Sequence, residues 1–208
     1  MYSPSSMKIS DTSVAHQVID EFGFGLIVST SLTGTHLPFV LHPDEGELGV
    51  LYSHCAKANP HWNEFLGTEV LLVFSGPHSY ISPSWYAAPP AVPTWNYVSV
   101  HLYGTVKPLS SDETLKAVEE LVTKYEPELL VERDVVTNAF RDKLLPNIVG
   151  FKVEISRFEG VQKLGQHRRV DDQAGVYRGL SSSGEGGAQN LARYMREKGI
   201  GVGVGVGE

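Results

Sequence analysis

The stretch Ser53 to Trp62 gathers side chains that suit anion binding. It reads Ser-His-Cys-Ala-Lys-Ala-Asn-Pro-His-Trp, so a lysine and two histidines lie close to the Asn59-Pro60 pair. An Asn-Pro pair is typical of a helix start. The free backbone N–H groups of a helix start, together with a lysine, favour a bound phosphate or carboxylate. A merely solvated Lys57 is the alternative interpretation of the same residues.

The spacing of the histidines and the cysteine supports a metal site or a catalytic nucleophile less well than it supports anion binding. His54 and Cys55 are adjacent, and neighbouring strand residues point to opposite faces, so one ion cannot easily take both. The chain has no paired-cysteine, His-Glu-x-x-His or Gly-x-Ser-x-Gly motif, and no Gly-x-x-x-x-Gly-Lys phosphate loop. We therefore predict no metal site, and the sequence assigns no catalytic residue.

Aromatic residues are concentrated between positions 74 and 104. This stretch holds two of the three tryptophans, four of the nine tyrosines and two of the eight histidines. Large apolar faces with polar tips suit a pocket for a flat, partly polar ligand, and they equally suit a subunit interface. Core strands with polar edges would give the same pattern. The residues alone leave these three interpretations open.

The elements that position these residues are predicted mainly as strands. A first helix is predicted at about 11–21, followed by strands at about 26–30, 35–42 and 49–54. Pro38 places its strand at an edge or a bulge. A helix is predicted within 56–66, and the apolar stretch 69–74 predicts a buried strand. The three prolines of 87–93 predict an exposed loop.

The second half of the chain adds helices to the sheet. Alternation predicts strands at about 97–103 and 149–155, and a capping-box pattern at Ser110 and Glu113 begins a helix. Further helices are predicted at about 134–144, 171–180 and 186–198, and a flexible Gly/Val tail at 199–208. We expect a single domain over 1–198, a mainly β, α+β fold in which a β-barrel carries a helical insertion near 110–145.

Composition limits the class of protein further. The 208 residues have a formal net charge of −7 and a single cysteine. No window approaches the roughly 18 apolar residues of a membrane span. We therefore expect a soluble protein without a membrane partner, and the lone Cys55 fits the reducing cytoplasm. The acidic balance argues against direct DNA binding, because affinity for DNA rests largely on neutralised phosphates.

Blocks of sequence in order over about residues 1–180 carry a family resemblance. They are Thr35-His-Leu-Pro38, His54-Cys-Ala-Lys-Ala-Asn-Pro-His-Trp62, Phe74-x-Gly-Pro-His-x-Tyr-Ile-Ser-Pro-Ser-Trp-Tyr86, Pro93-Thr-Trp-Asn-Tyr97 with His101-x-Tyr-Gly104, and Ile148-Val-Gly-Phe151. These blocks resemble the PaiB family, FMN-binding split-barrel proteins labelled negative transcriptional regulators. The Pro-Ser-Trp-Tyr and Pro-Thr-Trp-Asn-Tyr blocks are the specific ones.

The resemblance implies a six-stranded FMN-binding split β-barrel related to pyridoxamine-phosphate oxidase and flavin-reductase domains. It also implies a homodimer with flavin sites at the subunit boundary. By position, it implies that the cofactor contacts are Thr35, His36, Leu37, His54, Lys57, Asn59, Lys163, Gln166 and Arg168, with Lys57 and Arg168 offering charge to the phosphate.

The closing block, Glu159 to Arg168, departs from the family pattern at two positions. The resemblance gives the family's ending as Lys-Leu-Ser-Gln-Asn-Arg, and here Gly165 replaces the serine and His167 the asparagine. A lost hydroxyl and an amide-to-imidazole change alter the hydrogen bonds that this block offers to a flavin.

Several functions stay open at this point. A bound flavin would supply any redox chemistry, as in an FMN-dependent oxidoreductase or a flavin reductase. The family label implies a negative transcriptional regulator, which would act indirectly through the flavin. The alternatives are a haem-binding or haem-degrading split barrel and a repressor that binds DNA directly.

Overall fold

The computed structural model describes residues 1–131 and 135–203. These residues divide into two compact units. Unit 1 comprises Met1–Asp11, Ser75–Val100 and the described residues from Glu159 onward, and unit 2 comprises Thr12–Phe74 and His101–Phe158. The single domain expected over 1–198 stays a prediction.

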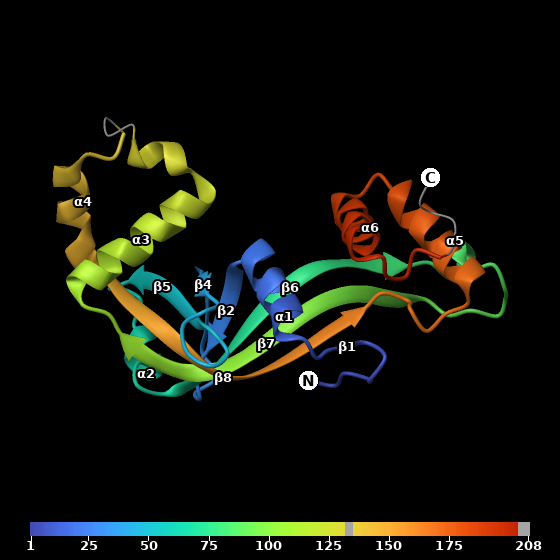
Figure 1. Ribbon diagram of the computed structural model, residues 1–208, viewed down its shortest axis with the longest axis horizontal. Coiled ribbons are helices and arrows are strands. Elements are labelled where there is room, and N and C mark those ends of the chain that lie inside the picture. The colour runs from blue at the N-terminus through green and yellow to red at the C-terminus, as the bar shows by residue number, and fades with distance from the viewer. Residues whose placement is uncertain (132–134, 204–208) are drawn as a thin grey trace. The chain divides into compact units, whose positions relative to one another are not determined.

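The elements follow one another as a mixture of strands, α-helices and short 3₁₀ helices, the last labelled η. In chain order they are β1 (Lys8–Ile9), α1 (Thr12–Glu21), β2 (Phe24–Val28), β3 (Gly34–Pro38), β4 (Val40–His42), β5 (Val50–Ala56), α2 (Trp62–Phe65), β6 (Glu69–Ile81), η1 (Pro83–Trp85), β7 (Thr94–Pro108), α3 (Ser111–Tyr125), η2 (Pro127–Leu130), α4 (Asn138–Leu144), η3 (Leu145–Asn147), β8 (Ile148–Lys163), α5 (Val170–Ser181) and α6 (Gly186–Lys198) (Figure 1).

The strands form a sheet in the order β3-β2-β6-β7-β8-β5-β4, and β1 pairs with β8. Every pair for which a register is defined is antiparallel, with Leu26 opposite His36 in β2–β3 and His54 opposite Gly150 in β5–β8. The mainly β, α+β class is confirmed. Each of the long strands β6, β7 and β8 contributes residues to both units.

The predicted strand 35–42 is wrong as a single element, because it is interrupted at Phe39, directly after Pro38. β3 pairs with β2, whereas β4 pairs with β5. Pro38 has no N–H for a ladder, and the Phe39 N–H instead donates to the Gly23 carbonyl at 2.8 Å. The Phe39 ring then lies in the core of unit 2, edge-on to Phe74 at 5.6 Å.

β5 presents alternate residues to the two faces of the sheet. Ser53 and Cys55 are buried, and the Ser53 hydroxyl donates to the Pro38 carbonyl at 2.7 Å. Burial raises the pKa of the Cys55 thiol to about 11, so the thiol is protonated at neutral pH. Tyr52 and His54 lie on the other face of the strand.

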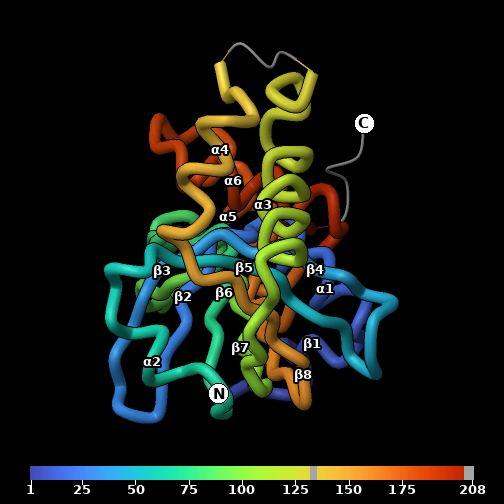
Figure 2. Tube along the Cα trace, turned by 90° about the vertical axis from the view of Figure 1, so that its left-hand side faces the viewer, coloured from blue at the N-terminus to red at the C-terminus, as the bar shows by residue number. Residues whose placement is uncertain are grey.

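The helical insertion begins where the capping-box pattern predicts. The Ser110 hydroxyl accepts from the Glu113 N–H at 3.3 Å, and the Glu113 carboxylate accepts from the Ser110 N–H at 2.8 Å. α3 packs on the sheet through Thr114, and a Cβ added at Gly150 of β8 would lie 2.1 Å from the Thr114 hydroxyl oxygen. α4 lies beside α3 (Figure 2).

Unit 1 has its own helical layer. α5 and α6 follow the predicted ranges 171–180 and 186–198 closely and pack against each other (Figure 1). Trp85 packs on α5, where a Cβ at Gly179 would lie 2.4 Å from the indole Cδ2 atom. α6 ends at Gly199 in the left-handed conformation (φ 64°), as expected for a C-cap glycine.

Several predicted boundaries need correction. The helix predicted within 56–66 is a single turn, α2, because Asn59 and His61 form a hydrogen-bonded turn before it. The strands predicted at 69–74, 97–103 and 149–155 all extend further, as β6, β7 and β8. α4 begins at Asn138 rather than 134, and residue 134 lies outside the described residues, as does 204–208 of the predicted tail. None of the described helices is long and apolar enough to cross a membrane.

Candidate functional site

A hydrogen-bonded network joins β3 to the turn before α2. The Asn59 side chain donates from Nδ2 to the Thr35 hydroxyl at 3.3 Å, and it accepts the His61 N–H at 3.0 Å. The Thr35 hydroxyl is also 2.7 Å from His61 Nδ1. Thr35 and Asn59, two of the predicted cofactor contacts, are therefore in direct contact.

His61 is the buried member of this network. The residue is 2 % exposed, and burial lowers the pKa of its imidazole. The Thr35 hydroxyl accepts from Asn59 and has both a donor and a second lone pair to share with His61 Nδ1, so it can pair with either tautomer of the neutral ring. His61 Nε2 is buried and makes no hydrogen bond within the described residues. The His61 and Phe65 rings are nearly perpendicular, with their centroids 5.0 Å apart.

The neighbours of Thr35 in β3 point in alternate directions. Leu37 is buried, with 8 % of its surface exposed. His36 is exposed, and its ring stacks on Phe24 with centroids 5.8 Å apart. The three predicted contacts of this strand thus do not share one face.

His54 lines a separate pocket under the helical insertion. Burial lowers the pKa of its imidazole, and its Nδ1 atom has no hydrogen-bond partner in the part of the chain that the structure describes. The pocket has a volume of about 240 Å³ and is lined by Pro38, His54, Val118, Leu121, Val122, Tyr125, Glu126 and Leu129. The other predicted cofactor contacts are not among these lining residues.

Lys57 is fixed through its backbone while its side chain is exposed. Its N–H donates to the Asn147 carbonyl at 2.8 Å, and its carbonyl accepts from the Trp62 indole N–H at 3.0 Å. The residue lines a cavity of about 450 Å³ whose other walls include Ser111, Thr114 and Asp142. This cavity holds both a cationic and an anionic side chain.

A second group of predicted contacts lies in unit 1, where Lys163 and Arg168 form a cationic cluster with His167. Lys163 donates to the Thr94 hydroxyl, and the Arg168 guanidinium lies 5.0 Å from the centre of the Tyr86 ring. Burial and the Arg168 charge lower the pKa of Lys163, and burial with both cations lowers that of His167. Among the residues that the structure describes, no carboxylate pairs with Lys163 or Arg168. The cluster is therefore suited to an anion.

Gln166 has a structural role in the turn after β8. Its side-chain oxygen accepts the Leu164 N–H at 2.8 Å, and its amide nitrogen donates to the carbonyls of Gln162 and Ser6. Gly165 before it has φ 81°, a conformation in which a serine would be strained. The glycine that departs from the family pattern thus suits the turn, and a flavin contact by Gln166 stays a prediction.

The aromatic stretch 74–104 divides between core and surface. Trp85 is packed on α5, but Tyr80 and Trp95 are 46 % and 53 % exposed. His78 and Tyr80 lie 6.1 and 6.4 Å from Trp95 between ring centroids. We call His78, Tyr80 and Trp95 the aromatic surface of unit 1.

Sequence reasoning missed the roles of His61, Thr94 and Tyr86. His61 was noted only as one of the two histidines of the anion-binding stretch, without a hydrogen-bonding role. No group of three or more His, Cys, Asp or Glu suited to a metal occurs among the described residues. The Asn59-Pro60-His61 order was the available signal, because an Asn side chain readily accepts the N–H two residues on. Thr94 and Tyr86 lie in the two specific family blocks, but nothing in the sequence indicated their partners, which are 69 and 82 positions away.

Comparisons with known proteins give a family model and similar full-length relatives. A family model described as "Putative FMN-binding domain" matches residues 1–157. "Protease synthase and sporulation protein PAI 2" of Bacillus subtilis is 33% identical over 206 residues, covering 95% of this chain and 98% of that protein. An uncharacterized protein of Emericella nidulans is 29% identical over 235 residues, covering 90% and 93%. The family match includes Thr35, Lys57 and Asn59 but ends before Lys163.

Solved structures show the same fold at low sequence identity. The flavocytochrome Anf3 of Azotobacter vinelandii aligns with a TM-score of 0.61 and 13% identity, over 76% of this chain and 69% of that chain. The FAD and heme binding protein of Mycobacterium smegmatis aligns with a TM-score of 0.58 and 12% identity, over 76% and 73%. The split-barrel expectation is confirmed by this likeness, but the six strands that the resemblance implies are a correction, because the described residues form an eight-stranded sheet.

Proposed function

The chain belongs to the "Putative FMN-binding domain" family, and from this premise we propose that its cofactor is FMN. The observation that carries the proposal is the hydrogen bond between Asn59 Nδ2 and the Thr35 hydroxyl, which are 3.3 Å apart. Both residues lie within the stretch that matches the FMN-binding family. We further propose that the protein acts as a homodimer in the cytoplasm.

The donors that the chain offers fit the chemistry of FMN. Hydroxyl and amide groups such as those of Thr35 and Asn59 suit the carbonyl and ring-nitrogen positions of a flavin. A phosphate monoester needs cationic side chains. Lys57 of unit 2 is one candidate anchor, and the cationic cluster of Lys163, His167 and Arg168 in unit 1 is another.

When bound, the flavin would supply redox chemistry. In this proposal the protein is an oxidoreductase whose electrons pass through the flavin. The chain itself binds the cofactor and fixes its orientation. Any regulatory role of the chain, as the family label implies, would then be exerted indirectly through this cofactor.

Reconstitution tests the proposal directly. Cofactor-free protein is titrated separately with FMN, FAD, riboflavin and haemin, and binding is followed by the change in each absorption spectrum. We expect FMN to bind more tightly than riboflavin, because riboflavin lacks the phosphate. If a Soret band develops at stoichiometric haemin and no flavin binds, the cofactor is haem rather than FMN. Equal affinity for FMN and riboflavin would show that neither Lys57 nor the cationic cluster binds the FMN phosphate.

A further inference from the structure

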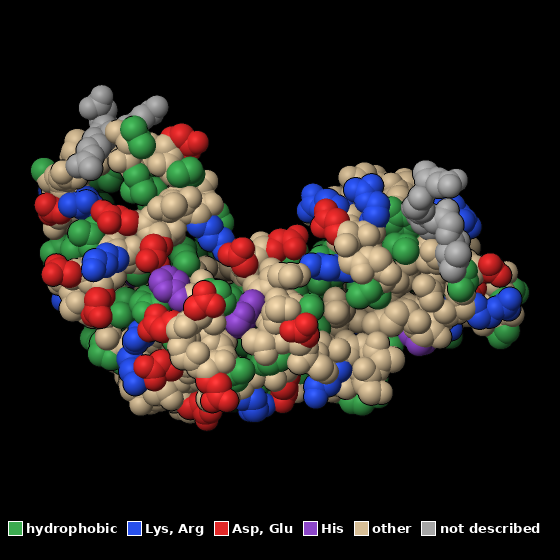
Figure 3. All heavy atoms as spheres, viewed as in Figure 1, with side chains coloured by type: hydrophobic (Ala, Val, Ile, Leu, Met, Phe, Trp, Pro, Cys, Tyr) green, Lys and Arg blue, Asp and Glu red, His purple; other side chains and the backbone are tan. Residues whose placement is uncertain are grey.

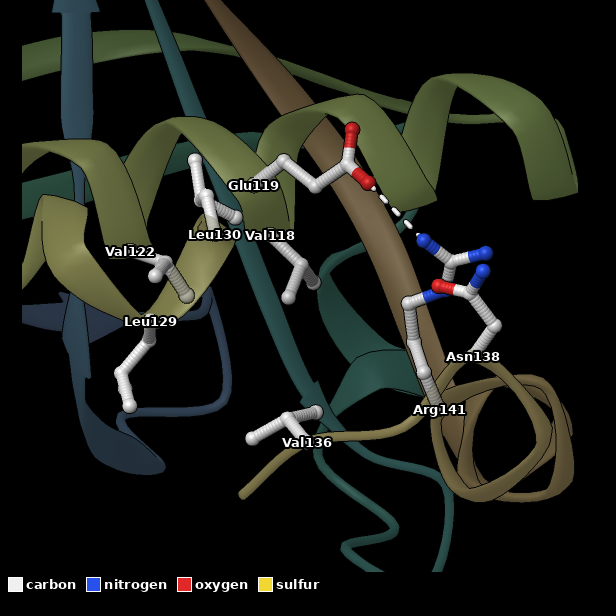
Figure 4. Close-up of a pocket in the computed structure, with 8 residues that line it drawn as sticks. All are labelled: Val118, Glu119, Val122, Leu129, Leu130, Val136, Asn138 and Arg141. Carbon is white, nitrogen blue, oxygen red and sulfur yellow. Dashed lines mark hydrogen bonds and ion pairs between the residues drawn. The ribbon is translucent and has the colours of Figure 1, made fainter. Parts of the chain in front are cut away.

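The helical insertion of unit 2 contains a pocket that the proposed flavin contacts do not line. Its volume is about 290 Å³, and its walls come from α3, η2, α4 and the segment before α4 (Figure 4). The lining residues are Val118, Glu119, Val122, Leu129, Leu130, Val136, Asn138 and Arg141. The family match covers this region without assigning it a role.

One end of the pocket is apolar. The side chains of Val118, Val122, Leu129, Leu130 and Val136 converge there (Figure 4). Leu130 and Val136 are 37 % and 39 % exposed, and other hydrophobic side chains lie on the surface over these helices (Figure 3). Side chains that line an unfilled volume lose dispersion contacts, so an apolar occupant would stabilise this end.

The opposite end is polar, and its charges are already paired. Arg141 donates to Glu119 at 3.1 Å and to Asp142 at 3.1 and 3.2 Å. Asn138 lies three residues before Arg141 on α4, so its amide faces the same side of the helix. Of these charged groups only Glu119 and Arg141 line the pocket, so an anionic ligand would meet the Glu119 carboxylate and a cationic one the Arg141 guanidinium. The amide of Asn138 offers a donor and an acceptor to a neutral group.

We propose that this pocket binds a small uncharged molecule with an apolar body and one carboxamide head group. The volume supports this size, because an engineered cavity of about 150 Å³ holds benzene. A ligand of about ten non-hydrogen atoms is therefore suitable, at the lower limit of typical small-molecule sites. The proposal is independent of the flavin.

Three ligands of the same shape test the head group. Phenylacetamide is neutral, phenylacetate is an anion and phenethylamine is a cation at neutral pH. Each is titrated into the full chain, and ¹H–¹³C methyl spectra report shifts at the valine and leucine methyls of the pocket. We expect phenylacetamide to bind at least about five-fold more tightly than either charged analogue, the scale of one neutral hydrogen bond plus a desolvation penalty. Tighter binding of a charged analogue, or no saturable shift with any of the three, overturns the proposal.

Two matched valine substitutions locate the site. Val136→Phe fills the pocket and should abolish the methyl shifts, whereas Val135→Phe adds the same ring one residue away, at a 68 % exposed position that does not line it. Asn138→Ala should weaken phenylacetamide about five- to ten-fold and leave the charged analogues nearly unchanged. Equal effects of the two phenylalanine variants would contradict the assignment.

The flavin titration separates this inference from the proposed function. Val136→Phe should bind FMN as the unaltered chain does, because Val136 is not among the proposed flavin contacts. If the unaltered chain fails to bind FMN, the phenylacetamide result still stands. If it fails to bind phenylacetamide, the FMN result still stands.

Discussion

His61 links two segments that lie 26 positions apart, through a hydroxyl and an amide rather than a charge. The hydrogen bond between the Thr35 hydroxyl and Nδ1 holds the orientation of the ring, and burial lowers its pKa. Among the nine predicted contacts, Thr35 and Asn59 are brought together by this network, and their contact with a flavin stays a prediction. His36 and Leu37 point to opposite faces, and His54 belongs to the pocket under α3.

Lys57→Ala should weaken FMN binding by about 1–3 kcal/mol, the scale of one lost charge-assisted hydrogen bond. Titration of cofactor-free protein by flavin fluorescence measures the change. Lys116→Ala, which removes an exposed lysine from α3, serves as the control and should leave the affinity unchanged. If Lys57→Ala binds FMN normally and Lys163→Ala or Arg168→Ala loses affinity, the cationic cluster rather than Lys57 binds the FMN phosphate.

Stability should fall as the pH drops through about 6.5, because His54 and His61 are both held below the ordinary pKa of 6.5. The unfolded chain takes up protons near that value, whereas the folded chain resists them until lower pH. Above this range both states carry neutral rings, so this contribution is constant there. Urea unfolding at about pH 7.5 and 5.5 measures the difference. His54→Leu should reduce the loss, and an identical loss in that variant would exclude His54 as a source.

At the scale of elements, glycines decide how closely helices approach the strands. Gly150 allows α3 to lie on β8, and Gly179 allows α5 to lie on Trp85. An alanine normally favours a helix over a glycine by up to about 1 kcal/mol. At Gly179 the indole occupies the space for the methyl group, so packing outweighs propensity.

Gly179→Ala should therefore destabilise the protein by about 1–3 kcal/mol, the scale of overpacking. Gly187→Ala in α6 is the matched control, because its Cβ would have its nearest contact at 3.5 Å, and it should be neutral or stabilising. The free energy of unfolding from urea titrations measures both. In a Trp85→Leu background the cost of Gly179→Ala should disappear, and a persistent cost there would refute the role of the indole.

Element types were more predictable from sequence than element lengths. The capping box of Ser110 and Glu113 and the spacing after it fix α3 locally, so the helix begins where the pattern predicts. β6 extends to Ile81 because alternate residues beyond Phe74 remain buried, among them Ser79, whose polarity masked the pattern. The break at Phe39 depends on a backbone bond to Gly23, which no local pattern reveals.

The whole molecule is predicted to be a homodimer. The aromatic surface of His78, Tyr80 and Trp95 supports this, because Tyr and Trp are enriched at subunit interfaces. Light scattering at micromolar concentration should give twice the chain mass of 22.8 kDa. Trp95→Glu should produce monomers, whereas Tyr2→Glu, at an 87 % exposed residue, should not. A mass of one chain for the unaltered protein would contradict the prediction.

Direct binding of duplex DNA should be no better than non-specific. With a net charge of −7, we expect dissociation constants at or weaker than roughly 10⁻⁴–10⁻⁶ M at about 150 mM salt. The cationic cluster is a local feature against this expectation, and Lys163→Ala shows whether it contributes to DNA binding. Anisotropy titration against the protein's own promoter region and a scrambled duplex is the measurement. Nanomolar affinity for the promoter alone would establish direct repression.

The burial of Cys55 has a practical consequence for spectroscopy. Its thiol is 2 % exposed and its pKa is raised to about 11, so it should react very slowly with maleimides or methanethiosulfonates at neutral pH. A cysteine placed at an exposed position such as Thr105 would then be the single fast-labelling thiol of the chain. In a symmetric dimer one nitroxide per chain gives one inter-label distance, so pulsed electron paramagnetic resonance can follow the assembly without removing the native cysteine.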